Sequence, residues 1–322
     1  MIPAKHELTL CFAHVAYHFQ ELFERRRTGI KSFQAWSRGE LDDRIAEADV
    51  LVISGLWRND LIERAKKLRY VQSIGAGTDQ YSRELLSARG IRLASARGVN
   101  ARAVSEHAIA LMLALTRRLP EARDNQVKRV WRDMIGDPAI REDELGGKTM
   151  IVVGTGAIGG RLTRLAKAFD MRVIGLRRDP ALGKGDADSI HATSELKALL
   201  PQADFVVLTC PLTKETEKLI DADALARMKR SAYLINVARG RCVDEAALQD
   251  ALAAGRIAGA ALDVTVEEPL APGSPLWGME NVFITPHTAG ETRRYEENVL
   301  DILQDNLDRL WRGEATLRNQ VL

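Results

Sequence analysis

Three glycines with the spacing G-x-G-x-x-G, Gly154, Gly156 and Gly159, have the pattern of a binding site for a pyrophosphate. The first permits a tight turn after a strand, the second lets backbone approach the phosphates, and the third lets a helix pack closely on the sheet. An apolar run at 149–153 precedes them. The predicted helix after them carries an apolar stripe, formed by Leu162, Leu165, Ala166 and Phe169. We therefore predict a dinucleotide site at the helix N-terminus; the alternative is a glycine-rich turn without a ligand.

The residues after the next predicted strand, at 172–176, indicate which dinucleotide would bind. NAD sites commonly place an acid about 20 residues after the glycines, where it binds the ribose 2′-hydroxyl. This chain has Arg177 and Arg178 there, followed by Asp179. A guanidinium can bind a 2′-phosphate through charge-assisted hydrogen bonds, whereas a carboxylate would repel it. We predict a preference for NADP(H), with NAD(H) also usable; alternatively, the arginines are solvated and Asp179 binds the ribose.

Arg239, Glu268 and His287 each follow a predicted strand. The carboxyl ends of strands form the ligand-binding edge of an open α/β sheet. A histidine and a carboxylate at that edge are suited to proton transfer, and an arginine would bind an anionic substrate. Each residue also has an ordinary interpretation: the arginine caps a turn, the glutamate is a solvated loop charge, and the histidine is a satisfied turn residue.

Apolar runs of strand length alternate with helical patterns along the whole chain, which predicts parallel sheets with crossover helices. The fold class we expect is α/β, with two Rossmann-like, doubly wound parallel-sheet domains and a cleft between them. Helical patterns lie around Ile45 and at 61–67, 101–119 and 292–311. Predicted strands lie at 8–12, 50–54, 71–74, 149–153, 172–176, 205–209, 233–237, 259–264 and 282–285.

The helix predicted at 101–119 is long and mostly apolar, so we place the switch between domains at its start, near Asn100. The last helix, at 292–311, is amphipathic and has no strand after it, so we expect it to pack back on the first domain. The expected domains are a substrate domain of residues 1–99 plus 291–322 and a dinucleotide-binding domain of residues 100–290.

Composition narrows the class of protein. The 322 residues include 46 basic and 44 acidic side chains, a balance that argues against nucleic-acid or acidic-membrane partners. Cys11, Cys210 and Cys242 are scattered and lack metal-ligand neighbours, so we expect buried thiols, no metal and a cytoplasmic location. No signal pattern opens the chain, and the longest apolar stretch, near 108–115, is too short to cross a bilayer.

Blocks of sequence along most of the chain resemble the D-isomer-specific 2-hydroxyacid dehydrogenases. The resemblance implies reduction of a small 2-keto acid, such as glyoxylate or hydroxypyruvate, to the D-2-hydroxy acid by hydride transfer from a nicotinamide without a metal. A larger or aromatic keto acid is the other option. Besides the glycine motif, the blocks are Ser73 to Asp79, Ala103 to His107, Cys210 to Thr216, Asn236 to Gly240, Leu262 to Leu270, Ser274 to Trp277 and Thr285 to Gly290.

The resemblance also assigns roles to individual residues. Arg239 is similar to the arginine that holds the substrate's carboxylate and carbonyl oxygen. His287 is similar to the acid that protonates this oxygen, and Glu268 to the partner that fixes its ring. The backbone amides of Ala76 and Gly77 resemble a loop that receives the substrate carboxylate.

On the cofactor side, the resemblance implies contacts along the whole dinucleotide. It implies as well a homodimer built largely on the cofactor domain, with cleft closure about hinges near Asn100 and Ala289. The implied cofactor contacts are Ala157 and Ile158 at the pyrophosphate, Pro211, Thr213 and Val237 along the adenosine and ribose, Asp263 at the nicotinamide carboxamide, and Gly290 closing the site.

A few residues depart from the family pattern or lack an assigned role. Asp170 stands where glycine is usual, and Thr78 replaces a common aromatic beside the carboxylate loop, which would widen the pocket. Trp57 and Arg58 follow a predicted strand of the first domain. We expect either that Trp57 shapes the substrate pocket and Arg58 meets a second anionic group, or that this is a surface loop with an ordinary tryptophan anchor.

Two other functions fit the same motifs. One is a relative acting on a substrate that is not a hydroxy acid, such as formate or phosphite. The other is a non-enzymatic, NAD(H)-sensing scaffold similar to the C-terminal-binding corepressors. The chain is too short to hold an additional regulatory domain of the kind found in longer phosphoglycerate dehydrogenases.

Overall fold

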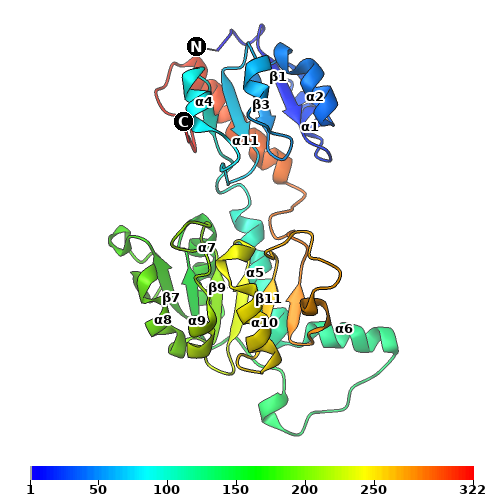
Figure 1. The fold of residues 1–322 in the computed structure, drawn as a ribbon, viewed down its shortest axis with the longest axis vertical. Coiled ribbons are helices and arrows are strands. Elements are labelled where there is room, and N and C mark those ends of the chain that lie inside the picture. Colours follow the sequence, from blue (N-terminus) through cyan, green and yellow to red (C-terminus); the bar gives the residue numbers. More distant parts are fainter. Residues whose placement is uncertain (1) are drawn as a thin grey trace. The chain divides into compact units, whose positions relative to one another are not determined.

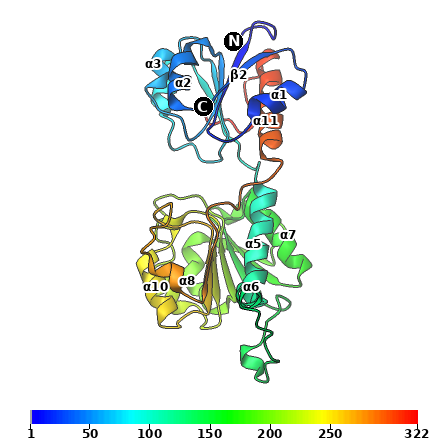
Figure 2. The same cartoon turned by 90° about the vertical axis from the view of Figure 1, so that its right-hand side faces the viewer.

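The computed structural model describes residues 2–322, which form two compact α/β units (Figures 1 and 2). One unit comprises the chain up to Asn100 together with Thr292–Leu322, and the other comprises Ala101–Glu291. Each unit is built on a parallel sheet with helices beside it, so the predicted fold class is confirmed.

The first unit contains a five-stranded parallel sheet with the order β2-β1-β3-β4-β5. Its central strand β3 is wholly buried and reads Val-Leu-Val-Ile, the continuous apolar run expected of a strand covered on both faces. The strands are β1 (Thr9–Ala13), β2 (Lys31–Ala35), β3 (Val50–Ile53), β4 (Tyr70–Ser73) and β5 (Arg92–Ala94). The helices are α1 (Phe19–Arg25), α2 (Arg38–Arg44), α3 (Leu61–Arg64), α4 (Arg83–Ala88) and α11 (Tyr295–Trp311).

The second unit contains a seven-stranded parallel sheet with the order β12-β11-β10-β9-β6-β7-β8. Strand order reverses between β6 and β9, which makes their carboxyl ends the topological switch point where such sheets bind ligands. The strands are β6 (Thr149–Val153), β7 (Arg172–Arg177), β8 (Ser189–Ala192), β9 (Phe205–Leu208), β10 (Tyr233–Asn236), β11 (Gly259–Leu262) and β12 (Val282–Ile284). The helices are α5 (Ala101–Thr116), α6 (Leu119–Lys128), α7 (Ala157–Ala168), α8 (Leu196–Leu199), α9 (Ala222–Arg227) and α10 (Glu245–Ala253).

Alternate residues of β6 contribute to two cores, one on each face of this sheet. Ile151 and Val153 belong to the core that includes β9, α9 and α10, whereas Met150 and Val152 belong to the core under α5 and α7. Of the stripe predicted on α7, Leu162 and Ala166 are fully buried and Leu165 is partly buried, whereas Phe169 follows the end of the helix and is exposed. The central strand and the helix that position the glycine motif are therefore fixed by packing on both sides.

Two predicted helices have different bounds in the structure. The helix expected at 101–119 ends at Thr116, and a second helix starts at Leu119 because Arg118 adopts a left-handed conformation with φ 51°. The pattern at 61–67 forms only the single turn Leu61–Arg64. Asp170, where the family pattern has glycine, also has a left-handed backbone, with φ 56°, in the turn from α7 to β7. Glycine adopts a left-handed backbone without steric cost, which explains why the family pattern has glycine at this position.

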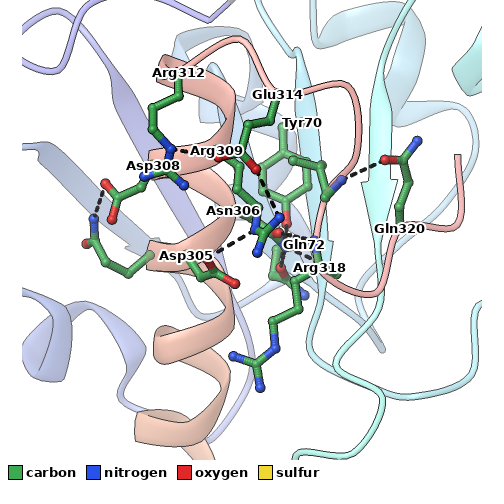
Figure 3. A network of polar contacts seen from close by, with 12 residues as sticks. Tyr70, Gln72, Asp305, Asn306, Asp308, Arg309, Arg312, Glu314, Arg318 and Gln320 are labelled. Atoms are coloured by element: carbon green, nitrogen blue, oxygen red, sulfur yellow. Dashed lines mark hydrogen bonds and ion pairs between the residues drawn. The ribbon is translucent and has the colours of Figure 1, made fainter.

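Helix α11 and the last residues of the chain are tied into the first unit by a buried polar network (Figure 3). Asn306 is fully buried, and its Nδ2 donates to the Tyr70 hydroxyl at 2.8 Å and to the Arg318 carbonyl at 3.1 Å. Its Oδ1 accepts from the Arg318 N–H at 2.7 Å. The final residues then pair with β5, where Val321 N–H donates to the Leu93 carbonyl at 2.8 Å.

Residues 2–322 contain three cysteines and no arrangement typical of a metal site or a membrane span. Cys11, Cys210 and Cys242 are all buried and free, and burial raises the pKa of the Cys11 thiol to about 12. In this part of the chain no group of three or more His, Cys, Asp or Glu side chains is arranged to hold a metal ion. None of its helices has both the length and the apolarity needed to cross a membrane.

Candidate active site

The glycine motif forms a tight turn from β6 into α7, and packing explains two of its glycines. Gly154 has φ 97°, and a Cβ there would lie 2.8 Å from the backbone of Cys210. A Cβ on Gly159 would lie 2.0 Å from the Gly154 carbonyl oxygen. At Gly156, by contrast, a Cβ would meet no described atom within 4 Å. Only the middle glycine therefore faces open space, as a residue against a ligand would.

The start of α7 fits the pyrophosphate of a dinucleotide. Gly156 is the N-cap of this helix, and no side chain caps it. Helices α9 and α10 of the same unit are capped by Asp221 and Asp244. The first N–H groups of α7, including those of Ala157 and Ile158, are thus left for an anion, which the helix dipole also favours.

Arg177 lies beside this turn, because β7 pairs with β6 and the Gly154 N–H donates to the Leu176 carbonyl at 2.8 Å. Its guanidinium makes one bond within the loop, from Nη1 to the Gly183 carbonyl at 3.1 Å, and Arg178 is exposed. The Asp179 carboxylate accepts from the Ala181 N–H at 3.0 Å and caps the turn Pro180–Leu182. Asp179 therefore holds its own loop, while both arginines retain free donors.

The other predicted cofactor residues follow strands of the same sheet. Pro211 is exposed after β9, the neighbour of β6, and the Thr213 N–H is bound at 2.7 Å by the Thr216 hydroxyl, which shapes that loop. Val237 is buried directly after β10. Gly290 is half-buried at the end of the loop after β12.

Arg239, Glu268 and His287 follow β10, β11 and β12, three strands that are neighbours in the sheet. His287 Nδ1 lies 2.6 Å from Glu268 Oε2, so the predicted histidine–carboxylate pair is formed. The other Glu268 oxygen accepts from the Thr265 N–H at 3.2 Å, which fixes the carboxylate. With Nδ1 facing Glu268, Nε2 is the ring atom of His287 left to exchange a proton with a bound molecule.

The backbone around Arg239 is rigid although its side chain is exposed. The Asn236 side chain accepts from the Ala238 N–H and donates to the Arg239 carbonyl, both at 3.0 Å. A Cβ on Gly240 would lie 2.0 Å from the backbone of Thr265, so this glycine lets the Arg239 loop touch the next one. The guanidinium donates one hydrogen bond to the Ala238 carbonyl at 2.6 Å, and its other N–H groups are available to an anion.

The backbone of His287 is left-handed, with φ 55°, and Asp263 holds it there. The Asp263 carbonyl accepts from the His287 N–H at 2.8 Å. The Asp263 carboxylate is 2% exposed and accepts from the Thr285 hydroxyl at 2.6 Å and from the N–H groups of Thr288 and Ala289 at 3.0 and 3.1 Å. The sequence predicts only a nicotinamide contact for Asp263; this anchoring role is not visible in it, since the donors lie more than 20 residues away.

In the first unit, Ala76 and Gly77 lie in the loop after β4. The loop is anchored at Gly75, whose N–H donates to the Ser73 hydroxyl at 3.2 Å and whose carbonyl accepts from the Ala96 N–H at 2.9 Å. Within residues 2–322, no acceptor takes the N–H of Ala76 or of Gly77. Two adjacent free amides on an anchored loop are suited to a carboxylate.

Trp57 and Arg58 have partners within the first unit, and their role in a substrate pocket stays a prediction. Trp57 is 6% exposed, its ring packs on Tyr81 at 4.9 Å, and its Nε1 donates to the Asn59 side chain. Arg58 pairs with Asp42 at 2.8 Å and with Asp60 at 3.1 Å. The tryptophan is an anchor, although in the core rather than at the surface, and the arginine is already neutralised by two carboxylates.

Comparison with known proteins identifies the scaffold. Residues 109–289, more than half of the chain, match the family model described as D-isomer specific 2-hydroxyacid dehydrogenase, NAD binding domain. The chain belongs to the D-isomer-specific 2-hydroxyacid dehydrogenase family. The resemblance seen in the sequence blocks is thereby confirmed.

Relatives of this chain within the family are named for different activities. The chain is 34% identical to a glyoxylate reductase of Korarchaeum cryptofilum over 86% of its own length and 84% of that protein. It is 35% identical to a D-3-phosphoglycerate dehydrogenase of Methanocaldococcus jannaschii over 86% of its length, but spans only about half (52%) of that relative. A family crystal structure from Aeromonas salmonicida superposes with a TM-score of 0.85 at 30% identity, covering 98% of this chain and 99% of that one.

Proposed function

We propose that this chain is an NADPH-preferring reductase that converts a small 2-keto acid, such as glyoxylate or hydroxypyruvate, to the D-2-hydroxy acid. The observation that carries the proposal is the pair His287–Glu268, joined at 2.6 Å beside an arginine that keeps free donors. Reduction of a keto acid requires an anion-binding cation and a proton donor, and these three residues are of the types required. The relative named glyoxylate reductase, similar over most of both chains, supports the substrate class.

The proposed roles follow from the geometry. Arg239 binds the substrate's carboxylate and its carbonyl oxygen, and the planar guanidinium fixes the orientation of the carbonyl. His287 delivers a proton from Nε2 to the carbonyl oxygen, and Glu268 holds the ring through Nδ1. Bound NADPH supplies the hydride. In the reverse direction His287 accepts the proton from the hydroxyl group.

We propose further that the amides of Ala76 and Gly77 receive the substrate carboxylate, because they are adjacent, anchored and without acceptors in the described chain. Preference for NADPH rests on Arg177 and Arg178, which follow β7 beside the glycine turn. Asp179 supports this choice indirectly, since its carboxylate is engaged by its own turn. Contact of Asp263 with the nicotinamide carboxamide remains part of the proposal.

The family resemblance implied a homodimer, and we propose the segment after α6 as its interface. Figures 1 and 2 show α6 and this segment projecting from the rest of their unit. Trp131 and Met134 are 96% and 98% exposed, and Trp131 lines a hollow of about 510 Å³ together with residues of α6 and Glu142. Large apolar side chains this exposed favour an interface. A second copy offers the same hollow and the same projecting side chains, as a two-fold interface requires.

The test of the proposed reaction is a rate panel with both cofactors. Initial rates of NADPH and NADH oxidation are measured with glyoxylate, hydroxypyruvate, pyruvate, phenylpyruvate and 3-phosphohydroxypyruvate. We expect the highest kcat/KM with NADPH and one of the first two acids. A best rate with the phosphorylated acid would instead support the activity named for the longer relatives. Cofactor binding without turnover on any keto acid would contradict the proposal.

A further inference from the structure

The loop that carries His287 is connected to helix α5 by a chain of polar side chains. His107, on α5, places its Nε2 at 3.0 Å from the Thr285 hydroxyl oxygen and 3.5 Å from Asp263 Oδ1. The Thr285 hydroxyl lies 2.6 Å from that same carboxylate oxygen. His107 belongs to a sequence block that supported the family resemblance, but neither the motif analysis nor the proposed reaction gives it a role.

The direction of each hydrogen bond among His107, Thr285 and Asp263 follows from the donors and acceptors present. An ionised carboxylate can only accept, so the single Thr285 O–H must donate to Asp263. The Thr285 oxygen can then only accept from the ring of His107. His107 therefore carries a proton on Nε2 and orients the hydroxyl of Thr285 toward Asp263.

This arrangement matters because the loop it supports is strained. His287 has a left-handed backbone, which is unfavourable for a residue with a Cβ and persists only where the surroundings hold it. Asp263 supplies several of the holding contacts: its carbonyl accepts from the His287 N–H, which also reaches the Thr285 carbonyl, and its carboxylate accepts from the next two N–H groups. The direction of that carboxylate thus sets the position of His287.

His107 lies on a helix that packs on the apolar core, yet its ring nitrogen is directed to two polar groups, Thr285 and Asp263. Val104, Ala108 and Leu111 of α5 are buried in the core above the sheet, beside β10 and β11. An apolar residue of similar volume would satisfy packing at this position equally well. The imidazole offers in addition a donor aimed at Thr285.

We propose that His107 is a positioning residue for the reductase reaction: through Thr285 and Asp263 it holds the His287 loop in its working conformation. This inference rests on the proposed function for its kinetic consequence. His107 acts through other residues and is not itself proposed to touch the substrate. Its contribution is the Nε2–H donor, so any side chain that supplies a donor at that point should replace it in part.

The kinetic test distinguishes the effect of the His107 hydrogen-bond donor from the effect of its side-chain volume. His107→Leu keeps an apolar filling and removes the donor, whereas His107→Gln retains an N–H near the position of Nε2. Thr285→Val removes the hydroxyl that links His107 to Asp263. Glu106→Gln is the matched control on the same helix, where Glu106 pairs with Arg161 at 2.9 Å. We expect kcat to fall about tenfold or more in His107→Leu and Thr285→Val. The KM, the cofactor Kd and the Tm should change little, and His107→Gln should restore most of the rate.

A second readout does not need turnover. In protein labelled with ¹⁵N-histidine, the ring signals of His107, assigned by their loss in His107→Gln, should show the Nε2–H tautomer. The His287 ring signals should shift in His107→Leu and Thr285→Val but not in His107→Gln or Glu106→Gln. If the wild-type chain reduces no keto acid, the proposed function fails, and these spectra still decide the positioning role.

Two results would overturn the inference. In the first, His107→Leu keeps the wild-type kcat and leaves the His287 signals unmoved. In the second, His107→Gln loses as much rate and as much thermal stability as His107→Leu, which would assign His107 to packing alone.

Discussion

At the scale of single residues, Arg239 combines a rigid backbone with a free guanidinium. Arg239→Lys keeps the charge and loses the planar fork that binds a carboxylate and a carbonyl together. We expect the KM for the keto acid to rise about tenfold or more and kcat to fall, because the carbonyl is no longer oriented. Steady-state kinetics, with fluorescence titration of NADPH to show an unchanged cofactor Kd, test this. An unchanged KM would remove Arg239 from the substrate site.

Arg177 lies where a 2′-phosphate is distinguished from a 2′-hydroxyl. Arg177→Asp replaces a charge-assisted donor by a repelling carboxylate, so the ratio of kcat/KM for NADPH over NADH should fall about tenfold or more. The matched control is Arg172→Asp, at the exposed amino end of the same strand β7. Equal ratios in the wild type and Arg177→Asp would contradict the NADPH assignment.

The site residues differ in how far the sequence could predict them. Arg239, Glu268 and His287 were predictable because each follows an apolar run, and neighbouring parallel strands bring such positions to one edge. Residue type alone does not reveal that Arg58 pairs with Asp42, 16 positions earlier in the chain. The anchoring by Asp263 was missed for the same reason, since pairing between distant residues depends on the fold and not on local pattern.

At the scale of elements, the strands missing from the sequence prediction are β2, β5 and β8, and all three lie at edges of their sheets. Central strands such as β3 and β6 are buried throughout and read as continuous apolar runs. In β8 every residue is only half-buried, and β5 has three residues. An edge strand has fewer neighbours to pack against, so its sequence carries a weaker apolar signal.

Helix α11 depends on one buried amide for its attachment to β4 and the chain end. Asn306→Ala removes a donor to the Tyr70 hydroxyl and leaves the N–H and carbonyl of Arg318 without their side-chain partner. We expect the free energy of unfolding to drop by about 2–4 kcal/mol. Scanning calorimetry should show this as a lower transition temperature.

The control for this variant is Arg312→Ala, which removes an exposed pair with Glu314 just after the end of α11. An exposed pair contributes about 0–1 kcal/mol, so its transition should barely move. Equal changes in Asn306→Ala and Arg312→Ala would show that the buried network does not stabilise the attachment of α11.

At the scale of the whole molecule, the proposed homodimer places Trp131 and Met134 in contact with a second copy. Trp131→Asp combined with Met134→Asp introduces charges that would be desolvated in the interface. We expect light scattering coupled to size exclusion to give a dimer for the wild-type chain and a monomer for the double variant. The matched control is Val15→Asp, a substitution of an exposed apolar residue outside this segment. A wild-type monomer, or a dimer in both variants, would contradict this interface.

His287 is proposed as the proton donor of a keto-acid reductase, and substitution of this residue is the decisive test. The rate of NADPH oxidation with the best keto acid is measured for the wild type and for His287→Asn, alongside the Kd for NADPH. We predict a kcat about 100-fold to 10,000-fold lower in the variant, with a cofactor Kd within about twofold of the wild type. A variant that retains near wild-type turnover would contradict the assignment of His287 and, with it, this account of the site.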